Sequence, residues 1–518
     1  MSLAPDLPTD IASLQALIID KDDRITRLEK LLAEFKRALF GAKSERVAAD
    51  QYELALEYIE VAVAVVRAED EQGTGSAVNA KASRKINRGA LPKHLPRVEE
   101  VIEPESLICE CSCVRHKIGE DVSERLDVIP SQFRVLVTRR PKYACRDCEN
   151  GIVQAPAKPH LIEGGLPTEA TLATITVNKQ GDHLPFYRQA GMFARQGVDI
   201  DRSTLAAWHG RVAYEMIPIY ERIKDHLKQS SKLFMDETPA PVLDPGRGKT
   251  KTGYFWALAR DDRPWGGDDP PAVAFTYAPS RAGKHAVEIL QGYNGILQVD
   301  GYTGYNRVRD TKGLGDIKLA YCWAHARRKL FELTINNVAP IAEEGIQQIK
   351  GFYRIESQIR GLSADERLAI CQEKTTPRMQ AFKAWVTHHR SQVSTKSPTG
   401  SALKYIAKHW EGLNLFLTDG RIEIDNNTVE RAIRPIALQR KNSLFAGHDA
   451  GAQNWAILAS ILETCKLNHI EPHSYQLSAL QQHTRLTYGS LIDDAVETLW
   501  ADYVSEGHEL PVLSTEHV

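Results

Sequence analysis

The segment from residue 232 to residue 333 constrains the fold more than any other part of the sequence. Its hydrophobic pattern changes from helical to strand-like, with short apolar runs at 233–235, 254–259, 272–277, 296–299 and 317–322. Runs of this length, bounded by turn residues, are typical of strands in a sheet. Helical patterns occupy 285–290 and 324–333. The predicted order is therefore three strands, a helix, a strand, another strand and a helix.

This is the order of a ribonuclease-H-like sheet, in which the first and fourth strands are neighbours. Asp236 and Asp300 each come directly after one of these two apolar runs, so we expect their carboxylates to lie side by side. Adjacent carboxylates repel each other unless a cation neutralises them, and Mg²⁺ prefers oxygen ligands. Glu430, on a helix predicted from 426 to about 437, is the candidate third ligand. Three other acids compete for these positions: Glu237, Glu423 and Asp425.

Three carboxylates of this kind can hold two Mg²⁺ or Mn²⁺ ions about 3.5–4 Å apart. Such a pair activates a water or a 3′-hydroxyl and stabilises the leaving oxygen of a phosphodiester. Each acid alone has an ordinary alternative role as a loop residue, a helix cap or, for Glu430, an ion pair with Arg434. Their order in one plausible fold favours catalysis.

The N-terminal region predicts a coiled coil. Apolar residues recur in alternating steps of three and four from Ile11 to Leu39, with Lys21 as the one polar residue in the seam. This heptad pattern with charged flanks predicts self-association, although an amphipathic helix packed on its own domain has a similar pattern. A glycine-containing and then basic segment at 70–97 follows; it is either a solvated tether or a segment that contacts phosphates.

Five of the eight cysteines lie close together, which predicts a structural zinc site. Cys145 and Cys148 have the two-residue spacing of a zinc half-site. The other half is irregular, and two of Cys109, Cys111 and Cys113, with His116 nearby, would complete the four ligands. The residues at 133–140 and 142–143 between the halves are predicted to be strands of a zinc ribbon. Free thiols are the alternative.

Residues 164–230 predict a helix-turn-helix region. Helical patterns cover 169–180, a stretch that starts near Pro185 and ends at Gly197, and a stretch that starts at Asp201. This geometry would place the last helix in a major groove, with four residues as candidate DNA contacts: Arg202, Ser203, Thr204 and His209. An ordinary helical hairpin is the alternative.

The sequence as a whole predicts a multidomain α/β protein. The boundaries expected are a coiled coil at 1–69, a basic linker at 70–97, a zinc-ribbon-like domain at 98–163, the helix-turn-helix region at 164–230, a catalytic core at 231–334 and 421–448 interrupted by a helical insertion at 335–420, and a C-terminal helical region at 449–518. The formal net charge of −2 excludes a uniformly basic coat protein, and no apolar run is long enough for a membrane span of roughly 20 residues. No secretory signal is expected.

Specific motifs along the chain resemble those of the transposases of the insertion sequence 66 family. They include Lys-Tyr-Ala-Cys-Arg-Asp-Cys at 142–148, Leu-Pro-Phe-Tyr-Arg-Gln at 184–189, Met-Asp-Glu-Thr at 235–238, Val-Asp-Gly-Tyr at 299–302, Cys-Trp-Ala-His-Ala-Arg-Arg at 322–328 and Asp-Asn-Asn-Thr-Val-Glu-Arg at 425–431. The resemblance covers nearly the whole chain. It departs at Cys109, Cys111 and Cys113, where the family usually has a Cys-x-x-Cys pair, so the exact zinc ligands stay open.

The resemblance implies that Asp236, Asp300 and Glu430 form a DDE catalytic triad. It implies metal-dependent cleavage of DNA at terminal inverted repeats, followed by transfer of the 3′-hydroxyl to target DNA, in a bacterial cytoplasmic, nucleoid-associated protein. It also implies accessory proteins encoded by the same element. A catalytically inactive DNA-binding regulator and a nuclease without joining activity are the alternatives.

Positively charged side chains near the predicted triad are candidate contacts to double-stranded DNA. Cations there would hold phosphates beside the metals, whereas surface ion pairs or a packed histidine are the ordinary alternatives. The candidates are His325, Arg327, Arg328, Arg431, Arg434 and Lys441.

Overall fold

The computed structural model describes residues 97, 132–144, 152–162, 164–244, 247, 249–311, 315–335 and 339–486. The predicted coiled coil at 1–69, the basic linker up to residue 96 and the stretch 487–518 lie outside these residues. So do the five candidate zinc ligands, Cys109, Cys111, Cys113, Cys145 and Cys148. The chain divides into two units: residues 1–62 with 142–490, and residues 63–141 with 491–518.

The described residues of the second unit, 97 and 132–141, form neither helix nor strand. The prediction of a strand at 133–140 is therefore wrong. Val135, Leu136 and Val137 are exposed, and apolar composition alone does not make a strand without a paired neighbour. In the first unit, the predicted strand at 142–143 is confirmed as β1 (Lys142–Ala144), which pairs antiparallel with β2 (Ile152–Gln154).

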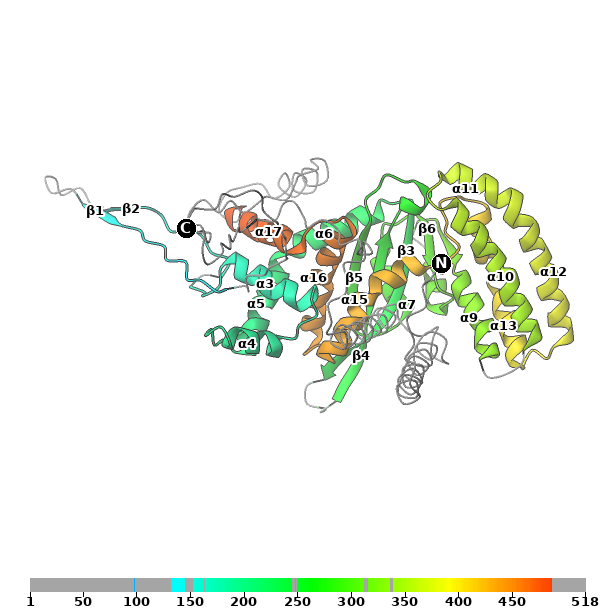
Figure 1. Cartoon of the computed structure of the whole chain (residues 1–518), viewed down its shortest axis with the longest axis horizontal. Helices are drawn as coiled ribbons and strands as arrows, with labels where there is room; N and C mark the ends of the chain where they lie inside the picture. The colour runs from blue at the N-terminus through cyan, green and yellow to red at the C-terminus, as the bar shows by residue number, and fades with distance from the viewer. Residues whose placement is uncertain are drawn as a thin grey trace, which may run out of the picture. The chain divides into compact units, whose positions relative to one another are not determined.

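The centre of the first unit is a five-stranded mixed sheet with the strand order β5-β4-β3-β6-β7 (Figure 1). Strands β3, β4 and β5 are antiparallel, whereas β6 and β7 run parallel to β3. The order of elements along the chain is the predicted one, except that the connection between β6 and β7 contains the short helix α8. The bounds are β3 Lys232–Asp244, β4 Lys249–Arg260, β5 Ala272–Ala278, α7 Gly283–Ile289, β6 Gly295–Val299, α8 Asn306–Asp310, β7 Ile317–Tyr321 and α9 Trp323–Thr334.

Strand β3 does not end at Asp236, as its apolar run had suggested. It continues to Asp244, because its backbone pairs with β4 from Phe234 to that residue. Its pairing with β6 covers only Lys232 to Phe234. Backbone pairing does not depend on apolar side chains, so the strand outlasts the hydrophobic run.

Alternation along β3 separates two hydrophobic cores. Phe234, Ala240 and Val242 pack with residues of α15 (Asn427–Ser443) and α16 (Asp449–Leu467) on one face of the sheet. Leu233 and Met235 belong to a core on the other face. Successive side chains of a strand point to opposite faces, so Asp236 lies on the α15 face and Glu237 on the opposite face.

The core that contains Leu233 and Met235 is completed by helices from residues 169–228 and by α17. The predicted helices at 169–180, after Pro185 and after Asp201 are confirmed, and Asp201 caps the last by accepting a hydrogen bond from the Ser203 backbone N–H at 2.7 Å. The bounds are α3 Glu169–Gln180, α4 Phe186–Ala194, α5 Arg202–Glu215, α6 Ile217–Lys228 and α17 Pro472–Leu486.

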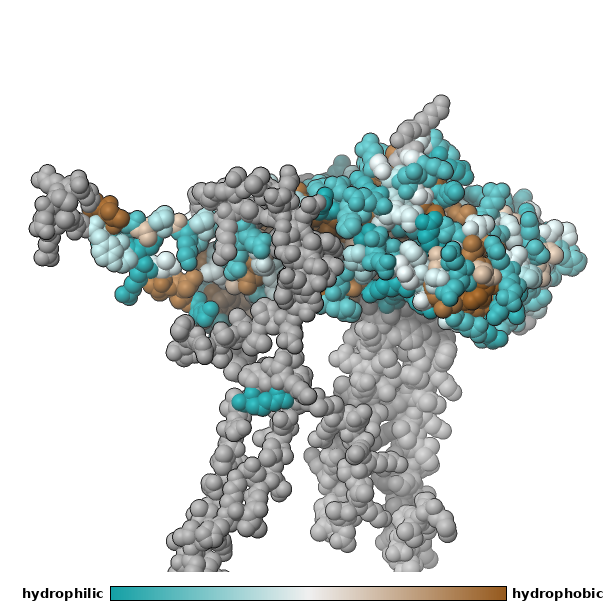
Figure 2. Space-filling view, turned by 90° about the horizontal axis from the view of Figure 1, so that it is seen from above, coloured by the Kyte–Doolittle hydropathy of each residue, from teal (hydrophilic) through white to brown (hydrophobic). Residues whose placement is uncertain are grey.

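The segment between α9 and α15 is helical and contains no strand among its described residues, as predicted from its pattern. Trp323 anchors its core through ring contacts with Phe352, Phe382 and Trp410. Figure 1 shows these helices in yellow, and their visible surface in Figure 2 is largely hydrophilic. The bounds are α10 Pro340–Ile359, α11 Ala364–Ile370, α12 Thr376–Gln392, α13 Pro398–Lys408 and α14 Trp410–Leu413. No helix among the described residues combines the length and apolar character that a bilayer span requires.

Candidate active site

Asp236 lies on β3, on the face covered by α15. Its Oδ1 accepts a hydrogen bond from the Glu237 backbone N–H at 2.8 Å. Burial raises the pKa of Asp236 well above its ordinary value, and the negative charges of Glu237, Asp300 and Glu430 raise it further. The carboxyl group is therefore both desolvated and surrounded by like charge.

Asp300 follows β6 directly, as predicted, and β6 is the parallel neighbour of β3. Its Oδ1 accepts a hydrogen bond from the Tyr302 backbone N–H at 2.8 Å, which fixes the carboxylate at the strand end. Asp300 keeps the alternation of Gln298, whose side chain bonds the backbone of Glu423 and Asp425 just before α15. Asp300 is thus directed to the same side of the sheet as Asp236.

Glu430 lies in the first turn of α15. Burial is the largest cause of its raised pKa; the positive charge of Arg328 opposes the shift, and Asp425 and Asp300 add to it. Its Oε1 is buried without a hydrogen-bond partner among the described residues, and His325 Nδ1 is 3.9 Å away. Because the described structure leaves this oxygen unsatisfied, it is available to a ligand.

These three carboxyl groups are oxygen donors of the kind that a divalent cation prefers. They come from β3, the end of β6 and α15, and each of Asp236 and Glu430 has its pKa raised by the charge of Asp300. Mutual repulsion of this kind destabilises the ionised site unless a positive charge enters it. Oxygen ligands from carboxylates suit Mg²⁺ or Mn²⁺.

The competing acids are committed to other partners. Glu237 accepts a hydrogen bond from the Tyr305 hydroxyl at 2.7 Å and forms an ion pair with Arg281. Glu423 lies 3.5 Å from Lys232 Nζ and 3.8 Å from Arg360. Asp425 accepts hydrogen bonds from the backbone N–H and side-chain amide of Asn427 at 3.1 and 2.8 Å.

Cys322 is a neighbour of this site that the sequence analysis left without a role. Ligand atoms of Cys322, His325 and Glu430 lie within 4.8 Å of one another. Burial raises the pKa of the Cys322 thiol far above its ordinary value, and its sulfur accepts a hydrogen bond from the Asn426 backbone N–H at 3.2 Å. Cys322 thereby holds the start of α15 in place.

Three further residues that the sequence analysis did not assign to the site lie around Glu237, next to Asp236: Arg281, Tyr302 and Tyr305. Arg281 lies over the Tyr302 ring, 4.0 Å from its centroid, and the Tyr302 hydroxyl donates to the Arg281 carbonyl at 2.7 Å. Arg281 and Tyr305 together hold Glu237. The Val-Asp-Gly-Tyr motif carried a signal for Tyr302, whereas nothing in the sequence pattern singled out Arg281.

The prediction that His209 contacts DNA is wrong. Its side chain is buried against Phe186 and paired with Gln180 at 3.1 Å, so it faces the core and is not available to DNA. Arg202 and Ser203 are exposed and Thr204 is half-buried at the start of α5.

The remaining candidates lie on α9 and α15. Arg328 and Arg434 act electrostatically on Glu430, and Arg327 lies 5.5 Å from the Phe331 ring centroid. Arg431 is exposed and donates to the Thr428 hydroxyl at 3.1 Å, while Lys441 is exposed near the end of α15.

Comparison with known proteins adds independent findings to this geometry. The family model described as Transposase IS66 family matches residues 164–454, which include all three acids. Models described as Transposase C of IS166 homeodomain and as zinc-finger binding domain of transposase IS66 match 27–99 and 106–149. The chain is thus a transposase, a class of nucleic-acid-processing enzyme. It belongs to the IS66 transposase family.

Two similar proteins from one bacterium match most of this chain. The uncharacterized protein y4jD of Sinorhizobium fredii is 41% identical over 95% of this chain and 96% of its own length. The uncharacterized protein y4qI of the same organism is 42% identical over 93% of this chain and 89% of its own length. The zinc-finger match indicates structural zinc, and the transposase match indicates DNA as a partner.

Proposed function

We propose that this chain cleaves DNA at the terminal inverted repeats of an insertion sequence and joins the 3′-hydroxyl ends to target DNA. The observation that carries the proposal is the position of three acids on β3, at the end of β6 and in the first turn of α15, where β3 and β6 are parallel neighbours and the charge of Asp300 acts on both Asp236 and Glu430. The strand order β5-β4-β3-β6-β7, with its antiparallel and parallel parts, supports a ribonuclease-H-like core.

In this proposal Asp236, Asp300 and Glu430 hold Mg²⁺ or Mn²⁺. Two such ions supply charge stabilisation to the attacking and leaving oxygens of a phosphodiester. The protein's own groups orient the reactants: the Glu237 and Tyr302 backbone N–H groups fix the two aspartates. Arg328 and Arg434 offset the negative charge around Glu430, and in this proposal they hold DNA phosphates.

The remaining assignments complete the proposal. Two of Cys109, Cys111 and Cys113 join Cys145 and Cys148 on a structural zinc ion. The N-terminal coiled coil joins copies of the chain, and Arg202, Ser203 and Thr204 contact the inverted repeats. An inactive DNA-binding regulator is not favoured, because all three acids are present.

The test is a cleavage and strand-joining assay with the full-length protein, inverted-repeat DNA and Mg²⁺ or Mn²⁺. We expect Asp236→Asn, Asp300→Asn and Glu430→Gln each to lower joining by more than roughly 100-fold, because loss of a metal ligand exceeds loss of an outer partner. Asp310→Asn, which changes an exposed carboxylate on α8, is the matched control. Joining that survives Asp236→Asn would show that the triad assignment is wrong, and cutting without joined product would indicate a nuclease.

A further inference from the structure

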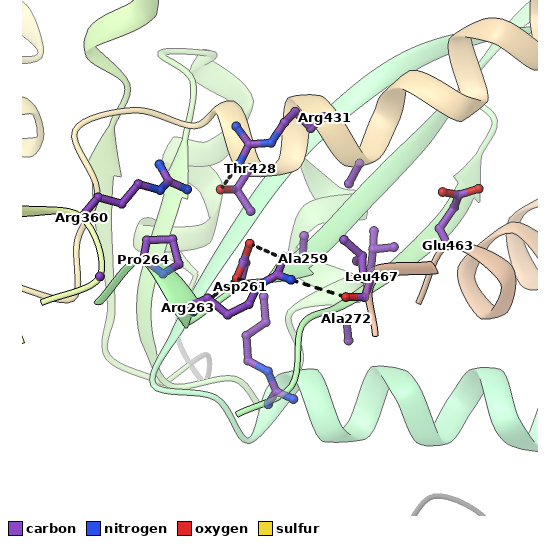
Figure 3. Close-up of a pocket in the computed structure, with 14 residues that line it drawn as sticks. Ala259, Asp261, Arg263, Pro264, Ala272, Arg360, Thr428, Arg431, Glu463 and Leu467 are labelled. Carbon is purple, nitrogen blue, oxygen red and sulfur yellow. Dashed lines mark hydrogen bonds and ion pairs between the residues drawn. The ribbon is translucent and has the colours of Figure 1, made fainter. Parts of the chain in front are cut away.

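A pocket of about 660 Å³ is lined by residues of α15, the sheet and α16 (Figure 3). Thr428 and Ala432, which line it, are each two residues from Glu430, and each residue of an α-helix turns the side chain by about 100°. They therefore lie on nearly the opposite side of the helix. Sites for small ligands usually have volumes of roughly 300–1,000 Å³, so the pocket is large enough for one nucleotide.

Two of the four arginines around the pocket are already committed to the fold. Arg260 is buried and donates to the Pro270 carbonyl and the Ser230 hydroxyl, with Asp269 at 3.3 Å. Arg263 is held by both carboxylate oxygens of Asp261, at 2.8 and 2.9 Å. The positive charges of Arg260 and Arg263 are therefore balanced by the carboxylates of Asp269 and Asp261.

Arg360 and Arg431 carry the charge that remains. Arg431 donates to the neutral Thr428 hydroxyl. Arg360 is half-exposed, and its carboxylate neighbour, Glu423 at 3.8 Å, is shared with the buried Lys232. The positive charges of both arginines also act on the nearby carboxyl group of Asp425, where they oppose the rise in pKa that burial causes. In Figure 3 the two guanidinium groups point toward each other at one side of the pocket.

The rest of the lining is mainly apolar. It includes Ala259 and Val273 from the sheet, Pro264, Ala432 and Leu467. Glu463 also lines the pocket, but its carboxylate is paired with Lys466 at 3.0 Å. Two arginines beside an apolar lining match the chemistry of a nucleotide, whose phosphate is anionic and whose base is largely apolar on its faces.

We propose that this pocket binds one nucleotide of a single-stranded DNA segment, with its phosphate held by Arg360 and Arg431 and its base against the apolar lining. The assignment rests on the proposed function for its ligand class, DNA, and the strand is single because a base enters a pocket only when it is unpaired and unstacked. It adds a second DNA-binding position on the far side of the helix that carries Glu430.

The test is the affinity of the full-length protein for a fluorescein-labelled single-stranded oligonucleotide, measured by anisotropy in EDTA so that no metal-dependent step occurs. We expect Arg360→Gln and Arg431→Gln each to weaken binding roughly tenfold and to lower the slope of log affinity against log salt by about one. Arg431→Lys keeps the charge and should retain more affinity than Arg431→Gln.

Arg354→Gln is the matched control, since Arg354 is an exposed arginine on α10 that does not line the pocket. Unchanged affinity in both pocket variants would overturn the proposal, and so would an equal loss in Arg354→Gln. The melting temperature of each variant in EDTA checks that the fold is intact.

Free nucleotides are the other source of the same phosphate chemistry. If dAMP raises the melting temperature of the wild type but not of the Arg360→Gln/Arg431→Gln variant, while oligonucleotide affinity is equal in the two proteins, the pocket holds free nucleotides and the DNA assignment is wrong. Deoxyadenosine, which lacks the phosphate, should compete poorly with the oligonucleotide. Because these measurements require no cleavage, failure of the joining assay would leave their result intact.

Discussion

Asp236 and Glu237 are adjacent in the sequence but differ in their surroundings, because the pleat of β3 directs them to opposite faces. Burial raises the pKa of both carboxyl groups. Glu237 has a guanidinium and a hydroxyl as partners, whereas three neighbouring acids raise the pKa of Asp236 further. The same alternation that separates the two hydrophobic cores thus separates a structural acid from the proposed metal ligand.

Asp236→Asn is expected to stabilise the metal-free protein. The raised pKa means that the ionised carboxylate costs stability at neutral pH, and the amide removes that charge. We predict a gain of about 1 kcal/mol in the free energy of unfolding in EDTA and a higher melting temperature. In Mg²⁺ the order should reverse, because the variant loses a proposed ligand. A lower melting temperature in EDTA would contradict this account of the site.

His209 provides a pH-dependence test away from the proposed metal ligands. Burial lowers its pKa to about 3, with a further contribution from Lys179, whereas an unfolded histidine titrates near 6.5. Below about pH 6.5 the unfolded chain binds a proton that the folded chain does not, so His209 makes stability fall by up to about 1.4 kcal/mol per pH unit. Above that pH its contribution is constant.

His209→Gln should remove this slope while the effects of other groups remain. Urea unfolding of both proteins between pH 4 and pH 8 measures the difference, with exposed His388→Gln as the control. A difference between wild type and His209→Gln that does not change with pH would show that His209 is not the buried neutral group described.

At the scale of elements, α16 completes the exposed edge of the sheet. Strand β5 is an edge strand, and the Ser460 hydroxyl accepts a hydrogen bond from the Phe275 backbone N–H at 2.8 Å. The Thr464 hydroxyl both accepts from and donates to the backbone of Val273, each at 3.1 Å. Two side chains one helical turn apart thereby satisfy backbone groups that a sixth strand would otherwise pair.

Thr464→Val should lower the free energy of unfolding by about 1–3 kcal/mol, because it leaves a buried N–H and C=O without a partner while conserving volume. Ser460→Ala should have a loss of similar size. Thr464→Ser retains the hydroxyl and should be milder. Chemical unfolding followed by circular dichroism measures all three; equal losses in Thr464→Val and Thr464→Ser would assign the effect to packing.

The sequence predicted the order of the elements because strand and helix periodicities are local. It also predicted that Asp300 follows a strand. It missed the length of β3, since pairing with β4 is a tertiary effect, and it placed His209 on the surface because one histidine on a helix does not reveal which face is covered. The roles of Arg281 and Arg360 depend on contacts between distant segments, which periodicity does not encode.

At the scale of the whole molecule, Trp323 links the sheet to the helical insertion. It begins α9 and is separated from the end of β7 by one residue. Its ring contacts Phe352, Phe382 and Trp410, and its Nε1 donates to the Leu413 carbonyl at 2.8 Å. Helices from both ends of the insertion thus pack on one side chain.

Trp323→Ala should lower stability by about 3–5 kcal/mol, with the earliest proteolytic cleavage inside residues 340–420. Trp323→Phe keeps most of the apolar contact but loses the hydrogen bond, and it should have a smaller effect. Calorimetry with mapped limited proteolysis checks both. Cleavage that begins in the N-terminal helices instead would show that Trp323 does not anchor the insertion.

The segment that leads back from the insertion is anchored on the sheet as well as on the insertion helices, where Arg367 of α11 donates to the Ile422 carbonyl. Gln298 bonds the backbone at both Glu423 and Asp425, the Trp323 N–H donates to the Ile424 carbonyl at 3.1 Å, and Lys232 at the base of β3 lies beside Glu423. Contacts with β3, β6 and α9 therefore fix residues 423–425, and with them the start of α15, which carries Glu430, relative to the strand that carries Asp236. Changes of length in the insertion that leave these anchors in place should therefore leave the carboxylate at its far end in the same position.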